Sequence, residues 1–93
     1  MNTSAKGRRA EHWVRGELER LGYTVVRAAA SKGPVDLVAW DADTIRLVQV
    51  KAGQRGCSPA EREVLRQLVR PTNATVEVWT LRDRALPLIK VLR

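Results

Sequence analysis

Residues 33–51 read GPVDLVAWDADTIRLVQVK, and this stretch decides the fold that the sequence predicts. Gly33-Pro34 marks a turn. Two short runs rich in β-branched residues follow, 35–40 and 45–51, and the polar residues 41–43 between them are a connection short enough for a hairpin. The stretch therefore predicts two antiparallel strands.

The residues before this hairpin predict a helix and a further strand. Apolar residues recur at spacings of four, four and three, the pattern of a helix with one buried stripe, at Ala10, Val14, Leu18 and Leu21. The helix is expected over 4–21, with Gly22 as its stop. The short run 23–27 is rich in β-branched and aromatic residues and predicts a strand.

The residues after the hairpin predict a second helix. Ser58 supplies an N-cap, Pro59 a first helical residue and Glu61 the glutamate of a capping box. The helix is expected to end before Pro71, which disfavours a helical conformation in the residue ahead of it. Its apolar residues are expected to point inward: Val64, Leu65, Leu68 and Val69.

Two more extended segments complete the predicted fold. The run 75–81 follows a helix, so we expect it to pair in parallel with the second hairpin strand. The segment 86–92 is expected to be an edge strand because Pro87 lies near its start. The order predicts an α/β fold in which a mixed sheet of four to five strands is flanked by two helices. A chain of 93 residues is expected to form a single domain, 1–93.

The composition narrows the classes of partner. Seventeen Lys and Arg against ten Asp and Glu give a formal charge of +7, which attracts polyanions. Nucleic acid is the leading candidate. A membrane surface fits less well, because the first helix mixes Glu11, Glu17 and Glu19 with its arginines. The remaining alternative is that the basic residues only keep the surface solvated.

Other classes are disfavoured by what the sequence lacks. It has no run of ~20 apolar residues, as a membrane span needs, and residues 1–9 lack the apolar region of a secretory signal. A cytoplasmic protein with no membrane partner is therefore expected. The single Cys57 and single His12 cannot build a disulfide framework or a four-ligand zinc site.

Three polar side chains of the hairpin are placed for metal-dependent chemistry. Asp36 opens the first strand, while Gln49 and Lys51 lie two residues apart on the second, so both point to one face. Carboxylate and amide oxygens are hard ligands that suit Mg²⁺ or Mn²⁺. A lysine beside the metal can orient or deprotonate an attacking water and offset charge on a phosphate. The pattern predicts phosphodiester hydrolysis with these three residues as its catalytic centre.

Simpler interpretations exist for each charged residue. Glu11 is a fourth candidate for the catalytic centre, because it lies about 100° round the helix from Ala10 and could reach over the end of the sheet. Taken alone, Glu11 is better explained by an i,i+4 pair with Arg15, and only the three residues of the hairpin favour a functional role for it. Asp36 could cap the turn before it, and Lys51 could face solvent. A charged side chain in an otherwise apolar strand is unfavourable, and this favours the functional interpretation.

These residues resemble the sequence motif of a known family. The string from Gly33 to Ala39, followed thirteen residues after Asp36 by Gln49-Val50-Lys51, resembles the motif of the PD-(D/E)xK nucleases. Further matches make the sequence similar to the archaeal Holliday-junction resolvases and their phage relatives: Lys6-Gly7, Glu11, Gly22-Tyr23, Val26-Arg27 and Ala30-Ser31. The resemblance implies a restriction-endonuclease-like core and a homodimer that cuts branched DNA, such as a four-way junction, with magnesium and no small-molecule cofactor.

The resemblance also implies individual roles. Glu11 and Asp36 would be metal ligands and Lys51 a catalytic residue, while Arg27 and Ser31 would contact the active site or a DNA phosphate. Other basic residues in the N-terminal segment and the loops could follow a DNA backbone, namely Lys6, Arg8, Arg9, Lys32 and Arg55. Three tryptophans fall in predicted regular elements, where core or interface packing is favoured over base stacking: Trp13, Trp40 and Trp79.

Gln49 stands where the family has its second acidic residue. An amide keeps a ligating oxygen but not the negative charge, so the metal affinity is expected to fall with Gln49 as third ligand. Some modification-dependent restriction endonucleases look similar, with Gln-x-Lys at this place. Two alternatives to an endonuclease stay open. One is a non-catalytic DNA-binding module, and the other an accessory subunit that dimerises through Leu86-Pro87-Leu88-Ile89.

Overall fold

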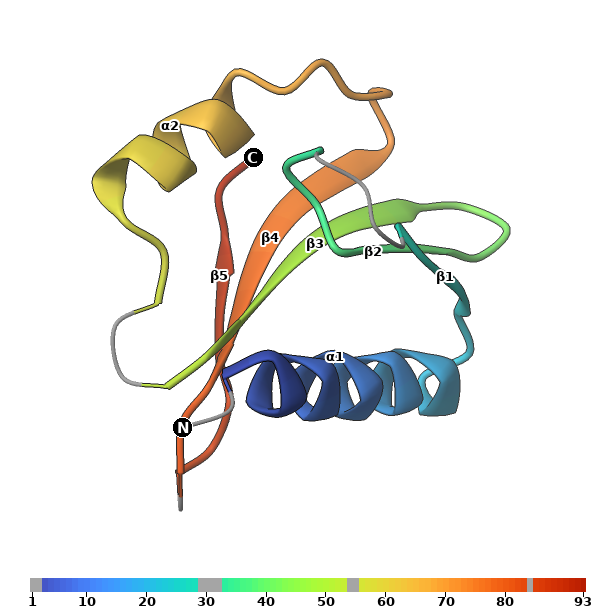
Figure 1. The fold of residues 1–93 in the computed structure, drawn as a ribbon. Helices are drawn as coiled ribbons and strands as arrows, with labels where there is room; N and C mark the ends of the chain where they lie inside the picture. Colours follow the sequence, from blue (N-terminus) through green and yellow to red (C-terminus); the bar gives the residue numbers. More distant parts are fainter. Residues whose placement is uncertain (1–2, 29–32, 54–55, 84) are drawn as a thin grey trace.

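A five-stranded mixed sheet is the centre of the computed structural model, which describes residues 3–28, 33–53, 56–83 and 85–93 (Figure 1). Neighbouring strands are also consecutive along the chain, in the order β1-β2-β3-β4-β5. The elements are α1 (Thr3–Arg20), β1 (Thr24–Arg27), β2 (Leu37–Trp40), β3 (Ile45–Ala52), α2 (Pro59–Arg66), β4 (Ala74–Leu81) and β5 (Leu88–Val91).

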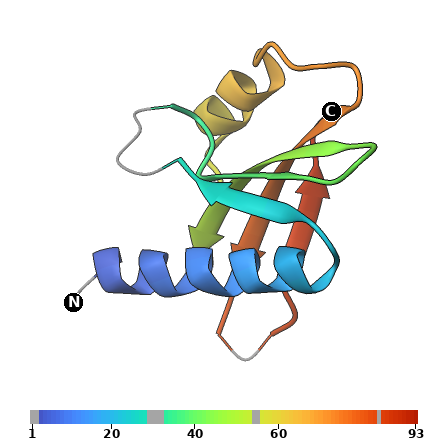
Figure 2. The same cartoon turned by 90° about the vertical axis from the view of Figure 1, so that its right-hand side faces the viewer.

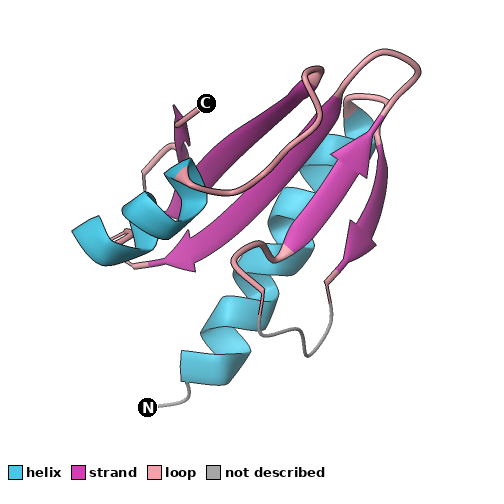
Figure 3. Cartoon of the chain, turned by 90° about the horizontal axis from the view of Figure 1, so that it is seen from above, coloured by secondary structure: helices cyan, strands magenta, loops and turns pink. Residues whose placement is uncertain are grey.

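The strand pairing follows from the connections. Strands β2 and β3 form the predicted antiparallel hairpin, and β1 pairs antiparallel with β2. The connection through α2 returns the chain to the same end of the sheet, so β4 pairs in parallel with β3, as predicted. Strand β5 pairs antiparallel with β4 and forms an edge. The two helices cover opposite faces of the sheet (Figures 2 and 3), which confirms the predicted α/β class.

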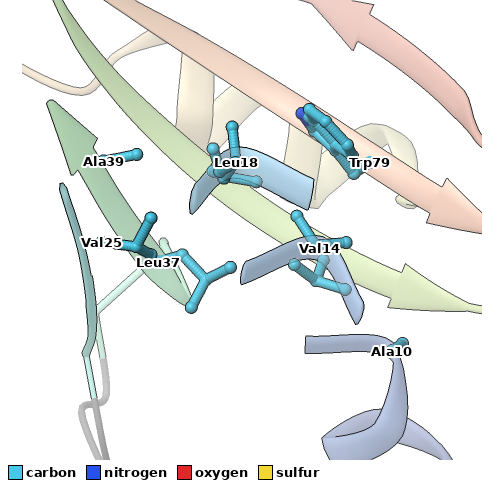
Figure 4. Packing of buried hydrophobic residues seen from close by; sticks show 9 residues of the cluster. Ala10, Val14, Leu18, Val25, Leu37, Ala39 and Trp79 are labelled. Carbon is cyan, nitrogen blue, oxygen red and sulfur yellow. The ribbon is translucent and has the colours of Figure 1, made fainter. Parts of the chain in front are cut away.

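The larger part of the core lies between α1 and the sheet (Figure 4). Ala10, Val14 and Leu18 of the predicted stripe are buried there, but Leu21 is exposed. The reason is that α1 ends at Arg20 in a Schellman motif, in which Gly22 adopts a φ of 100° and the Tyr23 N–H donates to the Leu18 carbonyl at 3.0 Å. Leu21 lies after the last helical residue, so the helical period no longer directs its side chain toward the core.

Helix α2 covers a smaller cluster on the other face. Its predicted capping box is present, with the Glu61 N–H donating to Ser58 Oγ at 3.2 Å and the Ser58 N–H donating to Glu61 Oε1 at 2.9 Å. Leu65 is buried and Leu68 is partly buried, but the inward placement predicted for Val64 and Val69 is wrong. Val64 lies about 100° round the helix from Leu65, and Val69 lies beyond the last helical residue and is 93% exposed.

A buried ion pair joins β3 and β4 and was not anticipated from the sequence. Glu77 is 2% exposed and accepts two hydrogen bonds of 2.8 Å from the Arg46 guanidinium. It also accepts hydrogen bonds from Trp79 Nε1 and Thr75 Oγ1, and the guanidinium lies 5.2 Å from the ring centroid of Tyr23. Burial acts to raise the pKa of Glu77, but these hydrogen bonds outweigh it and hold the pKa below its ordinary value.

The lengths and compositions of the two helices determine whether either could span a membrane. Within the described ranges of the chain, neither α1 nor α2 is long and apolar enough to cross a bilayer.

Candidate active site

Asp36 is held immediately before β2 by backbone and side-chain hydrogen bonds. Its N–H donates to the Val48 carbonyl at 2.8 Å, and its carbonyl accepts the Ala28 N–H at 2.9 Å. The ladder between β2 and β3 begins with the pair Leu37 and Val48, so the Val50 N–H lies just beyond it. Asp36 Oδ2 accepts this N–H at 2.8 Å. The aspartate is thereby fixed against the residue between Gln49 and Lys51.

Gln49 and Lys51 lie on the α2 face of the sheet. Their neighbours Val48 and Val50 are buried in the core beneath α1, and successive side chains of a strand alternate between faces. Asp36 and Gln49 both line a cavity of about 240 Å³. Its other lining residues come from the turn before β2 and from α2: Gly33, Pro34, Glu61, Val64 and Leu65.

Burial and four neighbouring groups shift the pKa of the Asp36 carboxyl. Burial raises the pKa of its carboxyl, while the Val50 hydrogen bond acts in the opposite direction. The negative charge of Glu11 adds to the rise, and the positive charges of Lys51 and Arg27 oppose it; the net pKa lies above the ordinary value. The electrostatic environment of Asp36 therefore includes α1, β1 and β3, although these side chains belong to different layers.

Lys51 pairs with Glu61, a residue that the sequence predicted only as part of a helix cap. Its Nζ forms an ion pair with Glu61 Oε2, and both side chains are partly exposed. Hydrogen bonds from Lys51 and then Ser58 lower the pKa of Glu61. The sequence did contain one indication of this contact: an acidic residue stands in the first turn of the helix that follows the Gln-x-Lys strand.

Glu11 lies in a separate cavity from the one that Asp36 and Gln49 line. Its Oε1 accepts a hydrogen bond of 3.0 Å from Arg27 Nε, so the alternative pairing with Arg15 is not formed. Arg15 instead lies 3.5 Å from Glu19. The Glu11 cavity measures about 280 Å³ and is strongly basic, with the lining Arg8, Glu11, His12, Arg15, Arg27 and Leu37.

The other predicted DNA contacts are divided between two places. Arg8 lines the Glu11 cavity, whereas Lys6 and Arg9 line a third cavity of about 420 Å³ between α1 and the connection from β4 to β5. These three residues lie in α1, within the helix predicted over 4–21. The remaining three predicted contacts lie outside the described residues: Ser31, Lys32 and Arg55.

One of the three tryptophans lies in the core, and the other two lie at the surface. Trp79 is buried, as predicted. Trp13 and Trp40 are 45% and 38% exposed, so they are not core residues, and packing in an interface stays a prediction for both. Trp13 lies about 100° round α1 from the buried Val14, and Trp40 is the last residue of β2, where the hairpin leaves the core.

The donor set around Asp36 suits a hard divalent cation. In the parts of the chain that the structure describes, no three His, Cys, Asp or Glu side chains form a group that could hold a metal ion. Mg²⁺ does not require one, because it commonly binds through one or two carboxylates and keeps several waters. The Val50 bond engages one oxygen of Asp36, and a carboxylate has lone pairs on two. Asp36 with the Gln49 amide oxygen therefore fits Mg²⁺ or Mn²⁺.

The five-stranded mixed sheet and its two helices form an α/β, nuclease-like fold. Hjc, a Holliday junction resolvase from the archaeal hyperthermophile Archaeoglobus fulgidus, has a similar structure with a TM-score of 0.76 and 25% sequence identity. The match covers 94% of this chain and 73% of the Hjc chain. No protein-family model and no curated protein matches the sequence. The resolvase-like fold is thus established by structure.

Proposed function

We propose that the protein is a metal-dependent endodeoxyribonuclease that cleaves branched DNA, as a PD-(D/E)xK nuclease of the Holliday-junction-resolvase type. The observation that carries the proposal is the bond from Val50 to Asp36, which holds a carboxylate beside Gln49 and Lys51 in a resolvase-like fold. Hjc is a Holliday junction resolvase, and this supports a four-way junction as the substrate.

Asp36 and Gln49 are the proposed ligands of Mg²⁺ or Mn²⁺, and Glu11, expected as a third ligand, lines the neighbouring cavity. A bound divalent cation supplies a Lewis acid that stabilises negative charge on the scissile phosphate. Glu11 already acts on Asp36 through its charge, but direct ligation would compete with Arg27 for its carboxylate. Asp36 therefore carries the main part of the site's affinity for the cation.

Lys51 is the residue proposed to act on the attacking water and to offset negative charge on the phosphate. Its ammonium group acts electrostatically on Asp36, and it lies on the same sheet face as Gln49. From that position it can orient the attacking water and offset the charge that develops on the phosphate. The ion pair with Glu61 keeps the flexible side chain at this end of β3.

Basic residues on α1 and β1 form the proposed DNA-binding surface. Arg8 and Arg27 line the cavity beside Glu11, so a phosphate held there would lie next to the reacting centre. Lys6 and Arg9 extend the positive charge along the first turns of α1. Contacts with phosphates give affinity without sequence preference, as a nuclease that recognises DNA shape requires.

A homodimer is also proposed, with β5 in the interface. All four residues of β5 are exposed, and three of them are large and apolar: Leu88, Ile89 and Val91. An edge strand of this kind readily pairs with another chain. A four-way junction has two symmetric cleavage points, which a two-fold dimer with two active sites would match.

The proposal is tested with a labelled four-way junction and a duplex of matched sequence, each incubated with the protein and Mg²⁺ or Mn²⁺. Cleavage of the junction in preference to the duplex is expected. Tight junction binding without cleavage would instead favour the non-catalytic module, an alternative that the neutral Gln49 side chain supports. Neither binding nor cleavage would favour an accessory subunit that dimerises through β5.

A further inference from the structure

Glu61 brings a second carboxylate to the Asp36 cavity from α2. It lines this cavity together with Asp36 and Gln49, and its Oε2 pairs with Lys51 Nζ. We propose that Glu61 supplies the negative charge that Gln49 lacks, so that a divalent cation is held by Asp36 and Glu61 with the Gln49 amide oxygen. The inference rests on the proposed function, because it assigns a further ligand to that same site.

The lining of the cavity supports this assignment. Seven described residues line it, and Asp36 and Glu61 are the two among them that carry a negative charge. Mg²⁺ is commonly bound by one or two carboxylates, with neutral oxygens and waters in its remaining positions. Asp36 and Glu61 therefore provide the charge of a two-carboxylate site even though position 49 is neutral.

The local structure of α2 fixes Glu61 over the correct face of the sheet. The capping box holds its Oε1 through the Ser58 N–H at 2.9 Å, and Leu65, one turn later, is buried on the same face as Gln49. A carboxylate has about four lone-pair positions, so the bonds from Ser58 and Lys51 leave capacity for a cation. The glutamate is thus anchored by the backbone before any metal binds.

The charges in the cavity also agree with the inference. Lys51 interacts electrostatically with Asp36 and forms the ion pair with Glu61, so one ammonium offsets two carboxylates. A net negative charge remains, and this charge is what attracts a cation.

The test is a charge exchange between the two positions, using Glu61→Gln, Gln49→Glu and the double variant. Glutamine serves in a capping box as glutamate does, so Glu61→Gln removes the charge and keeps the helix cap. Mn²⁺ binding is followed in the absence of DNA by the loss of the free-ion EPR signal. Glu63→Gln is the matched control, because Glu63 lies on the same helix, is exposed and bonds Gln67.

We expect Glu61→Gln to weaken Mn²⁺ binding by about tenfold or more, in the range found when residues supporting a metal site are lost. The double variant should return close to the wild-type affinity, and Glu63→Gln should match the wild type. Unchanged Mn²⁺ affinity in Glu61→Gln, with or without a loss of cleavage, would overturn the inference and leave Glu61 as a positioning residue for Lys51. Failure of the double variant to regain affinity would overturn it as well.

The same experiment separates this inference from the proposed function. Wild-type protein that neither binds Mn²⁺ nor cleaves junction DNA would overturn both. Wild-type protein that binds Mn²⁺ and cleaves, with a Glu61→Gln variant of equal Mn²⁺ affinity, would overturn only the role of Glu61.

Discussion

The Asp36 carboxylate accepts the Val50 N–H at 2.8 Å, and this bond ties the residue ahead of β2 to the residue between Gln49 and Lys51. The three proposed catalytic residues are therefore spaced by backbone geometry and not by contacts among long, flexible side chains. Precise spacing is what a hydrolytic site requires, since small displacements of reacting groups lower the rate strongly. The bond also has a practical use, because an asparagine at position 36 retains an acceptor for it.

The dimer is tested by placing a charge on the exposed edge strand. Ile89→Glu should convert a species of twice the chain mass into one of single mass in sedimentation equilibrium at micromolar concentration, because the apolar edge can no longer pair. Val26→Glu on β1 is the control, since Val26 and Ile89 are equally exposed, at 45%, on opposite edges of the sheet. A wild-type protein of single mass with full cleavage activity would rule out the dimer.

The DNA-binding surface is tested through its salt dependence. Each phosphate neutralised on duplex arms contributes about 0.9 to the slope of log affinity against log salt. Replacing Arg8 and Arg9 with alanine should lower that slope by up to about two units and weaken binding to every DNA shape similarly. Arg66→Ala, an exposed arginine on α2, should leave the slope unchanged. An unaltered slope in the Arg8/Arg9 variant would show that these residues are only solvated.

The Glu77 ion pair predicts a pH dependence of stability. Because the folded-state pKa of Glu77 is below the ordinary value of 4.5, its contribution is fully present above pH 4.5 and is lost as the pH falls through the lower folded pKa. Glu77→Gln should reduce the free energy of unfolding at pH 7 by up to about 3 kcal/mol, because it leaves Arg46 without its counter-charge. Urea unfolding at several pH values measures this, and the difference in unfolding free energy between Glu77→Gln and wild type should shrink as the pH falls below 4.5. A difference that stays constant with pH would contradict it.

Local patterns in the sequence predicted most of the fold. They could not predict the contacts between residues that are distant in the sequence. The hairpin, the parallel return through α2 and the capping box each depend on residues close in sequence, and all are confirmed. Asp36 and Gln49 were expected to converge because they lie on adjacent strands of one hairpin. The pairs that shape the site and core join separate elements whose packing no short pattern encodes: Glu11 with Arg27, Lys51 with Glu61, and Arg46 with Glu77.

Asp36 is proposed to hold the metal of a DNA-cleaving site, and Asp36→Asn tests this role most directly. The variant keeps an acceptor for the Val50 N–H but loses the negative charge, so fold and DNA contacts should remain while metal binding fails. Cleavage and binding of the same labelled four-way junction are measured side by side in Mg²⁺. We predict that cleavage disappears while junction affinity stays within a few-fold of wild type. Undiminished cleavage, or a loss of junction binding together with cleavage, would contradict the assignment of Asp36.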